Sequence, residues 1–397
     1  MPPRSALGPH TAIPYALAAF LIAATACQDS RVTAPIPLAS AVSSRAPAPS
    51  TDISVSSLGE LYAAVNNPAN AGKRVVVSAG TYALDAAAAG GVNGGRLELQ
   101  NDMSLVGASG HADDVIIDGT HASYTAPRGV TGAISIGRGT NSVEALTVRN
   151  ANAGAAGIIT DLVAGTSSHV RIAGVVATNS QRGIDIRNVV AGHAIEADLV
   201  DNDLYGNNTG NGQGVRFVNT GANGATIHAV LQRNSAHNNF IGCLAANLNS
   251  SDATITIESQ TDRFEGNGNG CILLGGNSQA AGVPTNRNVI DFQAHASRFS
   301  DNTGVRGVEP FPAGLLAIAG TSIKPNTASD NHISIETWGV KMGGNGGPDI
   351  AAWGARATVP AGTNDVVDIT IHGKPLDIVA TNSTPADPSG TNKVIVH

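Results

Sequence analysis

The chain has 397 residues, of which 13% are charged, 4% are aromatic and 47 are glycine. This composition excludes a disordered chain, which would carry more charge, and a helical bundle, because Gly, Asn, Thr and Val are weak helix formers. The formal net charge of −7 argues against a nucleic-acid-binding protein, which shows a basic surface. The composition favours many short strands joined by tight turns.

The N-terminus is typical of an export signal. Arg4 precedes an apolar run at 12–27, which is too short to span a bilayer comfortably and has small residues directly before Cys27. The segment resembles a bacterial lipoprotein signal, although Ala24 stands where such signals usually carry Leu. The resemblance implies lipidation of Cys27, and the alternative is an ordinary cleaved signal peptide. Both alternatives predict export, either to the outer membrane (facing the periplasm or the cell surface) or into the medium.

The chain is predicted to have four parts. The signal peptide (1–27) precedes a flexible tether rich in Pro, Ala and Ser (28–52). The folded body is expected at 53–345, with a terminal coil and C-terminal cap at 346–397. We expect a monomer that contacts the membrane through its N-terminal lipid alone.

The folded body opens with a predicted short helix. Ser56 or Ser57 can cap it, and Leu58, Leu61 and Ala64 fall along one face. The segment RVVVSAGTYAL that follows is predicted to form a strand, a turn and a second short strand.

An internal repeat follows, and it outweighs local propensity. Four units each open with a glycine and end in an asparagine, and successive glycines are 31, 28 and 28 residues apart. Each unit holds three short strand-like runs, which make one coil of a solenoid. The glycines are Gly183, Gly214, Gly242 and Gly270, and the asparagines are Asn207, Asn239, Asn267 and Asn302. An asparagine suits a turn because its amide bonds nearby backbone, so we expect a structural Asn ladder.

The repeat resembles the right-handed parallel β-helix of the pectate-lyase-like superfamily. The resemblance covers roughly 53–345 and is clearest at 183–302. It implies an all-β, single-stranded parallel β-helix with a short N-terminal capping helix. The superfamily contains polysaccharide lyases, glycoside hydrolases, epimerases, adhesins and proteins without activity, so the fold alone does not predict a function.

The stretch RGIDIRN, at 182–188, carries a candidate site. Apolar residues alternate along the Gly-led strands, so Ile184 and Ile186 are expected to point inward. The outward residues of adjacent coils then fall beside one another, and the expected neighbours are Asp185 with Arg216 and Asp161 with Arg187. These four charges are predicted to form one patch on three successive coils.

Two interpretations of the patch remain open. A lyase or epimerase acting on a uronic acid needs a cation to neutralise the carboxylate and a base to take the α proton. The strand GIDIRN also resembles GIDPHD of alginate epimerases: Asp185 matches the first Asp, but the His and second Asp of that motif are replaced by Arg187 and Asn188. The alternative is a pair of cross-strand ion pairs on a solvated sheet.

A second outward column belongs to the middle strand of each coil. Glu196 and His228 are expected to be neighbours, either as an acid/base pair that contacts a substrate or as solvated residues. Glu196 with Asp198 could hold Ca²⁺, although no third ligand is evident and no cofactor is required. His193 lies in the turn between the two strands, could reach either face and is a further candidate for binding a substrate.

The remaining candidates are cysteines and tryptophans. Cys243 and Cys271 are 28 residues apart, so they are expected to stack inward on adjacent coils, as a disulfide or as two core thiols. Trp338 and Trp353 are expected to cap the open end of the solenoid, or else to stack on a sugar.

The sequence thus predicts an exported β-helix protein that engages extracellular polysaccharide. Its catalytic version is a polysaccharide lyase or uronate epimerase, and its alternative is a non-catalytic surface, adhesion or structural protein.

Overall fold

The computed structural model describes most of the chain after the tether. The described residues are 52–88, 92–123, 131–151, 154–160, 168–278, 283–304, 312–322, 328–357, 362–384 and 391–397. The predicted signal peptide, the lipidation site Cys27 and all but the last residue of the tether lie outside this part of the chain.

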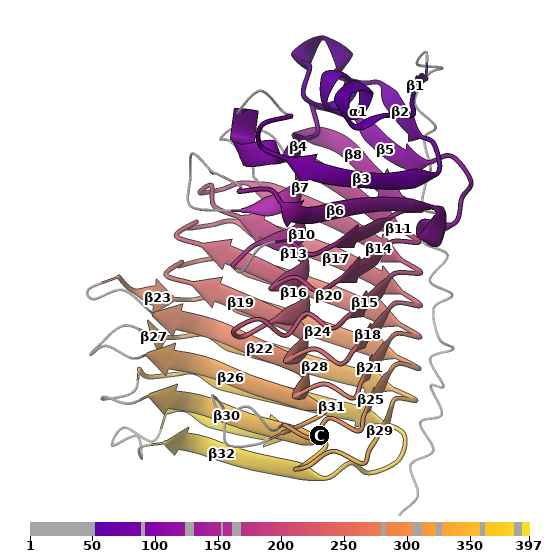
Figure 1. Cartoon of the computed structure of the whole chain (residues 1–397). Coiled ribbons are helices and arrows are strands. Elements are labelled where there is room, and N and C mark those ends of the chain that lie inside the picture. Colours follow the sequence, from indigo (N-terminus) through magenta and orange to yellow (C-terminus); the bar gives the residue numbers. More distant parts are fainter. Residues whose placement is uncertain are drawn as a thin grey trace, which may run out of the picture. The chain divides into compact units, whose positions relative to one another are not determined.

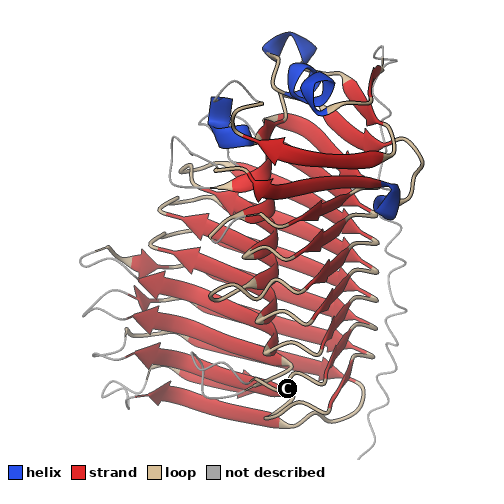
Figure 2. Cartoon of the chain, in the orientation of Figure 1, coloured by secondary structure: helices blue, strands red, loops and turns tan. Residues whose placement is uncertain are grey.

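The described residues form a parallel β-helix, as predicted. Successive strands pass in turn through three parallel sheets, and from β5 to β29 nearly every coil adds one strand to each sheet (Figure 1). In the described part, sheet I has 12 strands, sheet II has 9 and sheet III has 10. Strands dominate and helices are few (Figure 2).

Each of the three sheets contains short strands from successive coils. Sheet I contains β1 (Ile53–Val55), β2 (Arg74–Val77), β5 (Ser104–Gly107), β8 (Gly139–Glu144), β11 (Ser168–Ala173), β14 (Ala194–Val200), β17 (Thr226–Gln232), β20 (Thr254–Gln260), β24 (Val289–His295), β28 (His332–Trp338), β31 (Val366–His372) and β33 (Lys393–Val396). Sheet II contains β3 (Gly80–Asp85), β6 (Val115–His121), β9 (Thr147–Arg149), β12 (Val176–Thr178), β15 (Asp203–Tyr205), β18 (Ser235–His237), β21 (Arg263–Glu265), β25 (Arg298–Ser300) and β29 (Lys341–Gly343). Sheet III contains β4 (Leu97–Glu98), β7 (Gly132–Ile136), β10 (Ala156–Thr160), β13 (Arg182–Asn188), β16 (Gln213–Thr220), β19 (Ile241–Leu248), β22 (Asn269–Ser278), β26 (Leu315–Ser322), β30 (Ile350–Ala357) and β32 (Ile378–Thr384). A short pair, β23 (Thr285–Asn286) with β27 (Ala328–Ser329), lies apart from these sheets.

Helix α1 (Leu58–Val65) confirms the predicted N-terminal helix. Ser57 caps it: the Ser57 hydroxyl accepts a hydrogen bond from the backbone N–H of Glu60, whose side chain accepts from the Ser57 backbone in return. Three short 3₁₀ turns also occur, namely η1 (Pro68–Asn70), η2 (Val92–Gly95) and η3 (Ala112–Asp114). None of the helices in the described residues has the length and hydropathy that crossing a bilayer requires.

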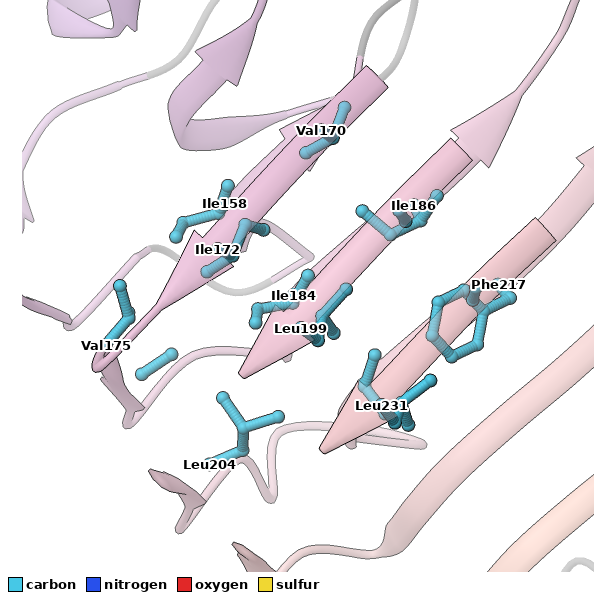
Figure 3. Close-up of a cluster of buried hydrophobic side chains, with 14 of the residues drawn as sticks. Ile158, Val170, Ile172, Val175, Ile184, Ile186, Leu199, Leu204, Phe217 and Leu231 are labelled. Carbon is cyan, nitrogen blue, oxygen red and sulfur yellow. The ribbon is translucent and has the colours of Figure 1, made fainter. Parts of the chain in front are cut away.

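The core fills the space between the three sheets. Ile184, Ile186 and Phe217 are fully buried and point toward residues of the other sheets, such as Leu199 and Leu204 (Figure 3). Their alternation confirms the predicted inward positions, because residues at i and i+2 share one face of a strand. Charged residues on the same strands therefore point outward.

The predicted Asn ladder is present at a corner of the coils. The side-chain oxygen of Asn239 accepts hydrogen bonds from the backbone N–H and the side-chain amide of Asn207, both at 3.1 Å. Asn267, Asn302 and Asn345 repeat this arrangement on the following coils. Each amide thus satisfies buried backbone groups, which otherwise cost about 1–3 kcal/mol each.

The leading glycine of each unit is required by close approach of the chain. A Cβ atom on Gly242 would lie 2.5 Å from the carbonyl oxygen of Gly270 and 2.8 Å from the side-chain nitrogen of Asn267. Both distances are shorter than van der Waals contact, so a larger residue would disturb the Asn ladder. The 28-residue glycine spacing therefore marks positions where adjacent coils approach too closely for a larger residue.

A second corner ladder contains one ionisable residue. Asn202, Asn234 and Asp262 follow one another on three coils, and Asp262 accepts hydrogen bonds from the backbone and side-chain amides of Asn234 at 2.7 and 2.9 Å. Asp262 is fully buried. Burial raises the pKa of its carboxyl from 3.8 to about 6, against hydrogen bonds from Ser259, Asn234 and Gln260 that lower it.

The tryptophans do not occupy the predicted capping position. Trp338 lies on the outer face of sheet I, where its ring stacks between His295 and His372 with ring centroids 4.1 and 4.9 Å apart. Trp353 lies on β30 in a buried apolar cluster on the outer face of sheet III. Both belong to lateral faces of the sheets, and strands β30 to β33 continue the sheets through the segment predicted to hold the terminal coil and cap.

Candidate functional site

Strand β13 holds the stretch RGIDIRN and has the predicted register. Asp185 pairs with Arg216 of β16 on the next coil, and Ile184 pairs with Val215. The outward column therefore runs from Asp185 to Arg216 and then to Leu244 of β19. The four strands β13, β16, β19 and β22 lie side by side in sheet III (Figure 1).

Asp185 and Arg216 form a buried, bidentate ion pair. The Nε atom of Arg216 donates to Oδ1 of Asp185 at 2.8 Å, and its Nη2 donates to Oδ2 at 2.5 Å. Asp185 has no exposed surface and Arg216 is 8% exposed. The predicted cross-strand ion pair is therefore present, but the expectation that it lies on a solvated sheet is not met, because Asp185 is buried and Arg216 keeps little exposed surface.

The carboxyl of Asp185 stays ionised in this environment. Burial raises its pKa, but Arg216, and then Arg182 and Arg187, lower it more strongly, so that the pKa lies below its usual value. A fully buried carboxylate whose two oxygens both accept hydrogen bonds from one guanidinium is suited to holding that guanidinium in place. Asp185 thus orients Arg216.

Arg182 is a third member of the cluster that the sequence interpretation did not select. Its Nε lies 3.9 Å from Oδ2 of Asp185, and its Nη1 donates to the carbonyl oxygen of Gly154 at 3.2 Å. Burial lowers the pKa of Arg182 to about 10, with further lowering by Arg216 and Arg187 and an opposing effect of Asp185. The sequence feature that could have identified Arg182 is its position at the start of RGIDIRN, three residues before Asp185.

Arg182 and Arg216 line one end of a hollow of about 380 Å³ on the outer face of sheet III. Amide side chains and glycines complete its polar part: Gln181, Asn211, Gln213, Gly268, Asn269, Asn277 and Gly304. Its apolar part consists of Phe240, Ile241, Leu244, Ala246, Leu248, Ile272 and Leu274. The described residues that line the hollow include no carboxylate and no imidazole.

The other two residues of the predicted charge patch are placed differently. Arg187 lies one position beyond the core residue Ile186, half-buried, and its backbone N–H donates to the Thr160 hydroxyl at 2.6 Å. Arg187 does not line the hollow. Asp161 lies outside the described residues, so its pairing with Arg187 stays a prediction.

The second outward column does not form the predicted acid/base pair. Glu196 and His228 are paired in register on β14 and β17. However, the Nε2 atom of His228 lies 3.2 Å from Oε1 of Glu258, diagonally on the next coil, and Glu258 rather than Glu196 is its hydrogen-bonding partner. This column belongs to sheet I, so it lies apart from the hollow on sheet III.

His193 is buried in the turn between β13 and β14. Burial, and then the charge of Arg138, lower the pKa of its imidazole. His193 is not among the described residues that line the hollow. Its role in binding a substrate stays a prediction.

Of the two predicted Ca²⁺ ligands, Glu196 and Asp198, the second has a histidine partner. Asp198 lies 2.8 Å from Nε2 of His169 through its Oδ2 atom. Across the described ranges of the chain, no group of three His, Cys, Asp or Glu residues is arranged to hold a metal ion.

Cys243 and Cys271 pair directly in register and are fully buried, as the 28-residue spacing predicts. Both are free thiols in the structure. Burial, and then a hydrogen bond with Cys243, raise the pKa of the Cys271 thiol well above its usual value. A thiol in this state is a poor nucleophile, so the pair acts as core. Its oxidation to a disulfide stays a prediction.

Comparison with known proteins finds distant structural likeness only. No family model matches the chain, and no curated protein matches it. The A-module of the mannuronan C-5 epimerase AlgE6 from Azotobacter vinelandii is 16% identical, with 86% of this chain and 93% of that chain covered and a TM-score of 0.37. The catalytic unit of a thermostable GH87 α-1,3-glucanase from Streptomyces thermodiastaticus strain HF3-3 is 13% identical, with 88% and 68% covered and a TM-score of 0.32. Likeness at this level assigns no function to the chain.

Proposed function

We propose that this protein binds an anionic polysaccharide in the hollow on the outer face of sheet III. The observation that carries the proposal is the pair of guanidiniums, Arg182 and Arg216, at one end of that hollow. Guanidinium groups bind carboxylates through paired hydrogen bonds, and the amides on the rim can bond sugar hydroxyls. The buried Asp185 holds Arg216 in place before a ligand arrives.

The charge balance of the cluster favours an anion. Arg182 and Arg216 share one fully buried carboxylate, Asp185, which does not line the hollow. The pKa of Arg182 is lowered first by burial, and the neighbouring charges of Arg216 and Arg187 lower it further against the opposing effect of Asp185. A ligand carboxylate placed against Arg182 would supply a further negative charge.

The dimensions of the hollow favour a chain-like ligand. Its lining comes from four successive strands of sheet III, β13, β16, β19 and β22, and from adjoining turns. Three strand spacings span about 14 Å along the β-helix axis. A short run of sugar units, lying across the strands, fits this length better than a single small molecule does.

Substitution Arg182→Gln is expected to weaken binding of a polyuronate about tenfold or more, because a charge-assisted hydrogen bond is lost. Binding is measured by isothermal titration calorimetry on the full-length chain, with polygalacturonate and with neutral dextran. Polygalacturonate should bind and dextran should not, and added salt should weaken the binding. Arg182 suits this test because it lines the hollow, and its guanidinium makes one hydrogen bond within the described residues, from Nη1 to the carbonyl oxygen of Gly154.

The matched control is Arg233→Gln, which removes an exposed arginine whose guanidinium pairs with Asp201 away from the hollow. Its affinity for polygalacturonate should equal that of the unchanged protein. The proposal is overturned if Arg182→Gln binds as tightly as the control, or if dextran binds as tightly as polygalacturonate.

A second candidate function is β-elimination on a uronic-acid polymer. The observation that favours it is Arg182, whose pKa is lowered to about 10 within a hollow that offers no carboxylate or imidazole among its described lining. Arg216 would hold the carboxylate, and Arg182 in its neutral form would take the proton α to it. The electron pair of that C–H bond forms the C=C bond, the C–O bond to the leaving sugar breaks, and the leaving oxygen takes a proton from water. Product absorbance that rises with pH toward about 10, and is absent in Arg182→Gln, would support a lyase. If product absorbance does not rise at any pH, elimination is excluded and the binding function alone remains.

Export belongs to the same proposal and rests on the sequence. An apolar run precedes Cys27, and a Pro/Ala/Ser-rich tether follows it, which together favour a lipid-anchored protein outside the cytoplasm. Labelling of expressing bacteria with a radioactive fatty acid should mark the chain and should fail for Cys27→Ser. Labelling that persists in Cys27→Ser would count against the anchor.

A further inference from the structure

The outer face of sheet III is apolar beyond the arginines. Leu244 and Ile272 follow Arg216 in the same outward column on the next two coils. In sheet I, by contrast, His228 is followed by Thr256 and Asp291 at outward positions of the same coils. Outward residues of a β-helix face water by default. In this column Ile272 is buried in an apolar cluster of the same face, whereas Leu244 packs against that cluster and keeps part of its surface exposed.

Among the described residues, the apolar part of this face beside the arginines keeps some exposed surface. Further along the same face, Leu316, Ile318 and Trp353 are buried in an apolar cluster that also includes Ile272 and against which Phe240, Leu244 and Leu274 pack. Leu244 and Leu274 are half-exposed and line the hollow together with Phe240. The accessible apolar surface of this face is therefore continuous with Arg182 and Arg216.

This juxtaposition constrains the ligand. An unmodified polyuronate has a hydroxyl or a carboxylate on every unit, and a hydroxyl pressed against Leu244 or Leu274 would lose its hydrogen bonds to water without replacement. An acetyl ester on such a hydroxyl removes the donor and presents a methyl group. It leaves the carboxylate of the sugar charged, which the arginines require.

We infer that the ligand is an O-acetylated acidic polysaccharide, an inference that rests on the proposed binding function. The carboxylate of one unit contacts Arg182 and Arg216, and acetyl groups on the following units cover the half-buried Leu244 and Leu274. Leu244 on β19 and Leu274 on β22 lie one and two coils from the coil of Arg216, about 5 and 10 Å along the axis. The acetyl groups therefore belong to the first and second sugar units after the bound carboxylate.

The test compares two polymers that differ only in acetylation. Polygalacturonate is chemically O-acetylated, and half of the batch is then deacetylated with mild alkali. Calorimetry on the full-length protein should give about tenfold tighter binding of the acetylated half, as expected for burial of two methyl groups. This comparison uses the unchanged protein, so it does not depend on the folding of any variant.

Leu244→Asn combined with Leu274→Asn should bring the ratio of the two affinities, acetylated to deacetylated polymer, to about one. The ratio is the readout because both half-buried side chains line the hollow and pack against the apolar cluster of this face, so the affinity for either polymer alone can change. The matched control is Val230→Asn, an outward and half-exposed position of β17 in sheet I, which should keep the preference.

The outcomes separate the two proposals. If the unchanged protein binds both polymers with equal affinity and Arg182→Gln loses affinity for both, the acetyl inference is overturned and the binding function stands. No binding of either polymer overturns the binding function. An O-acetylated dextran that binds as tightly as the acetylated polyuronate would also overturn the inference, because the arginines would then have no part in recognition.

Discussion

Substitution Asp185→Ala is expected to destabilise the protein by about 3–5 kcal/mol, the cost of removing one partner of a buried ion pair. Arg216 would keep its charge in a site where only 8% of its surface reaches solvent. Arg216 and Arg187 already lower the pKa of Arg182, so without Asp185 the cluster would hold like charges in close proximity. The free energy of unfolding, measured by urea denaturation at neutral pH, gives the effect.

Two further variants assign the cause of that loss. Asp185→Asn combined with Arg216→Gln removes both charges and should recover much of the stability, because neither polar group is left ionised and buried. Asp201→Ala breaks the exposed bidentate pair with Arg233 and should cost at most about 1 kcal/mol. A loss for Asp185→Ala no larger than that for Asp201→Ala would contradict the buried character of the Asp185–Arg216 pair.

Asp262→Asn should remove a pH-dependent part of the stability. The carboxyl of Asp262 has a pKa of about 6 in the folded protein and 3.8 as its reference value. Between these values the folded state binds the proton more tightly than the unfolded state, so stability falls as pH rises. The difference corresponds to about 3 kcal/mol, present below about pH 4 and lost above about pH 6.

The asparagine amide carries no titrating proton and offers the same acceptor oxygen to Asn234. The stability of Asp262→Asn relative to the unchanged protein should therefore improve steadily from pH 4 to pH 6 and then level off. Denaturation curves across this range measure it. Asp201→Asn provides the contrast, because Arg233 lowers the pKa of Asp201, so its effect appears only at more acidic pH. If the difference in the free energy of unfolding between Asp262→Asn and the unchanged protein stays constant from pH 4 to pH 8, Asp262 does not titrate in this range.

Much of the fold could be predicted because the repeat defines the register. Glycines 28 and 31 residues apart place Asp185 beside Arg216 and Cys243 beside Cys271, and the structure has both pairings. The recurring asparagines likewise predict the hydrogen-bonded ladder at the corner of the coils. Pairing in a parallel sheet depends on residue spacing and period, which are properties of the sequence alone.

The environment of the outward residues could not be predicted in the same way. Alternation shows that Asp185 points outward, but not that it is fully buried there. Register makes Glu196 and His228 neighbours, yet the imidazole bonds Glu258 on the next coil. Side-chain rotamers and diagonal neighbours decide such contacts, and neither follows from a period of two.

The sequence by itself determined the β-helix, the inward core and which residues lie opposite one another, because the repeat sets the strand register and alternation sets the two faces. Only the tertiary structure decided that Arg182 joins Arg216 at one end of a hollow, and that Leu244 and Leu274 remain accessible beside them. The reason is that burial of an outward residue depends on everything packed around it, including turns and strands distant in sequence.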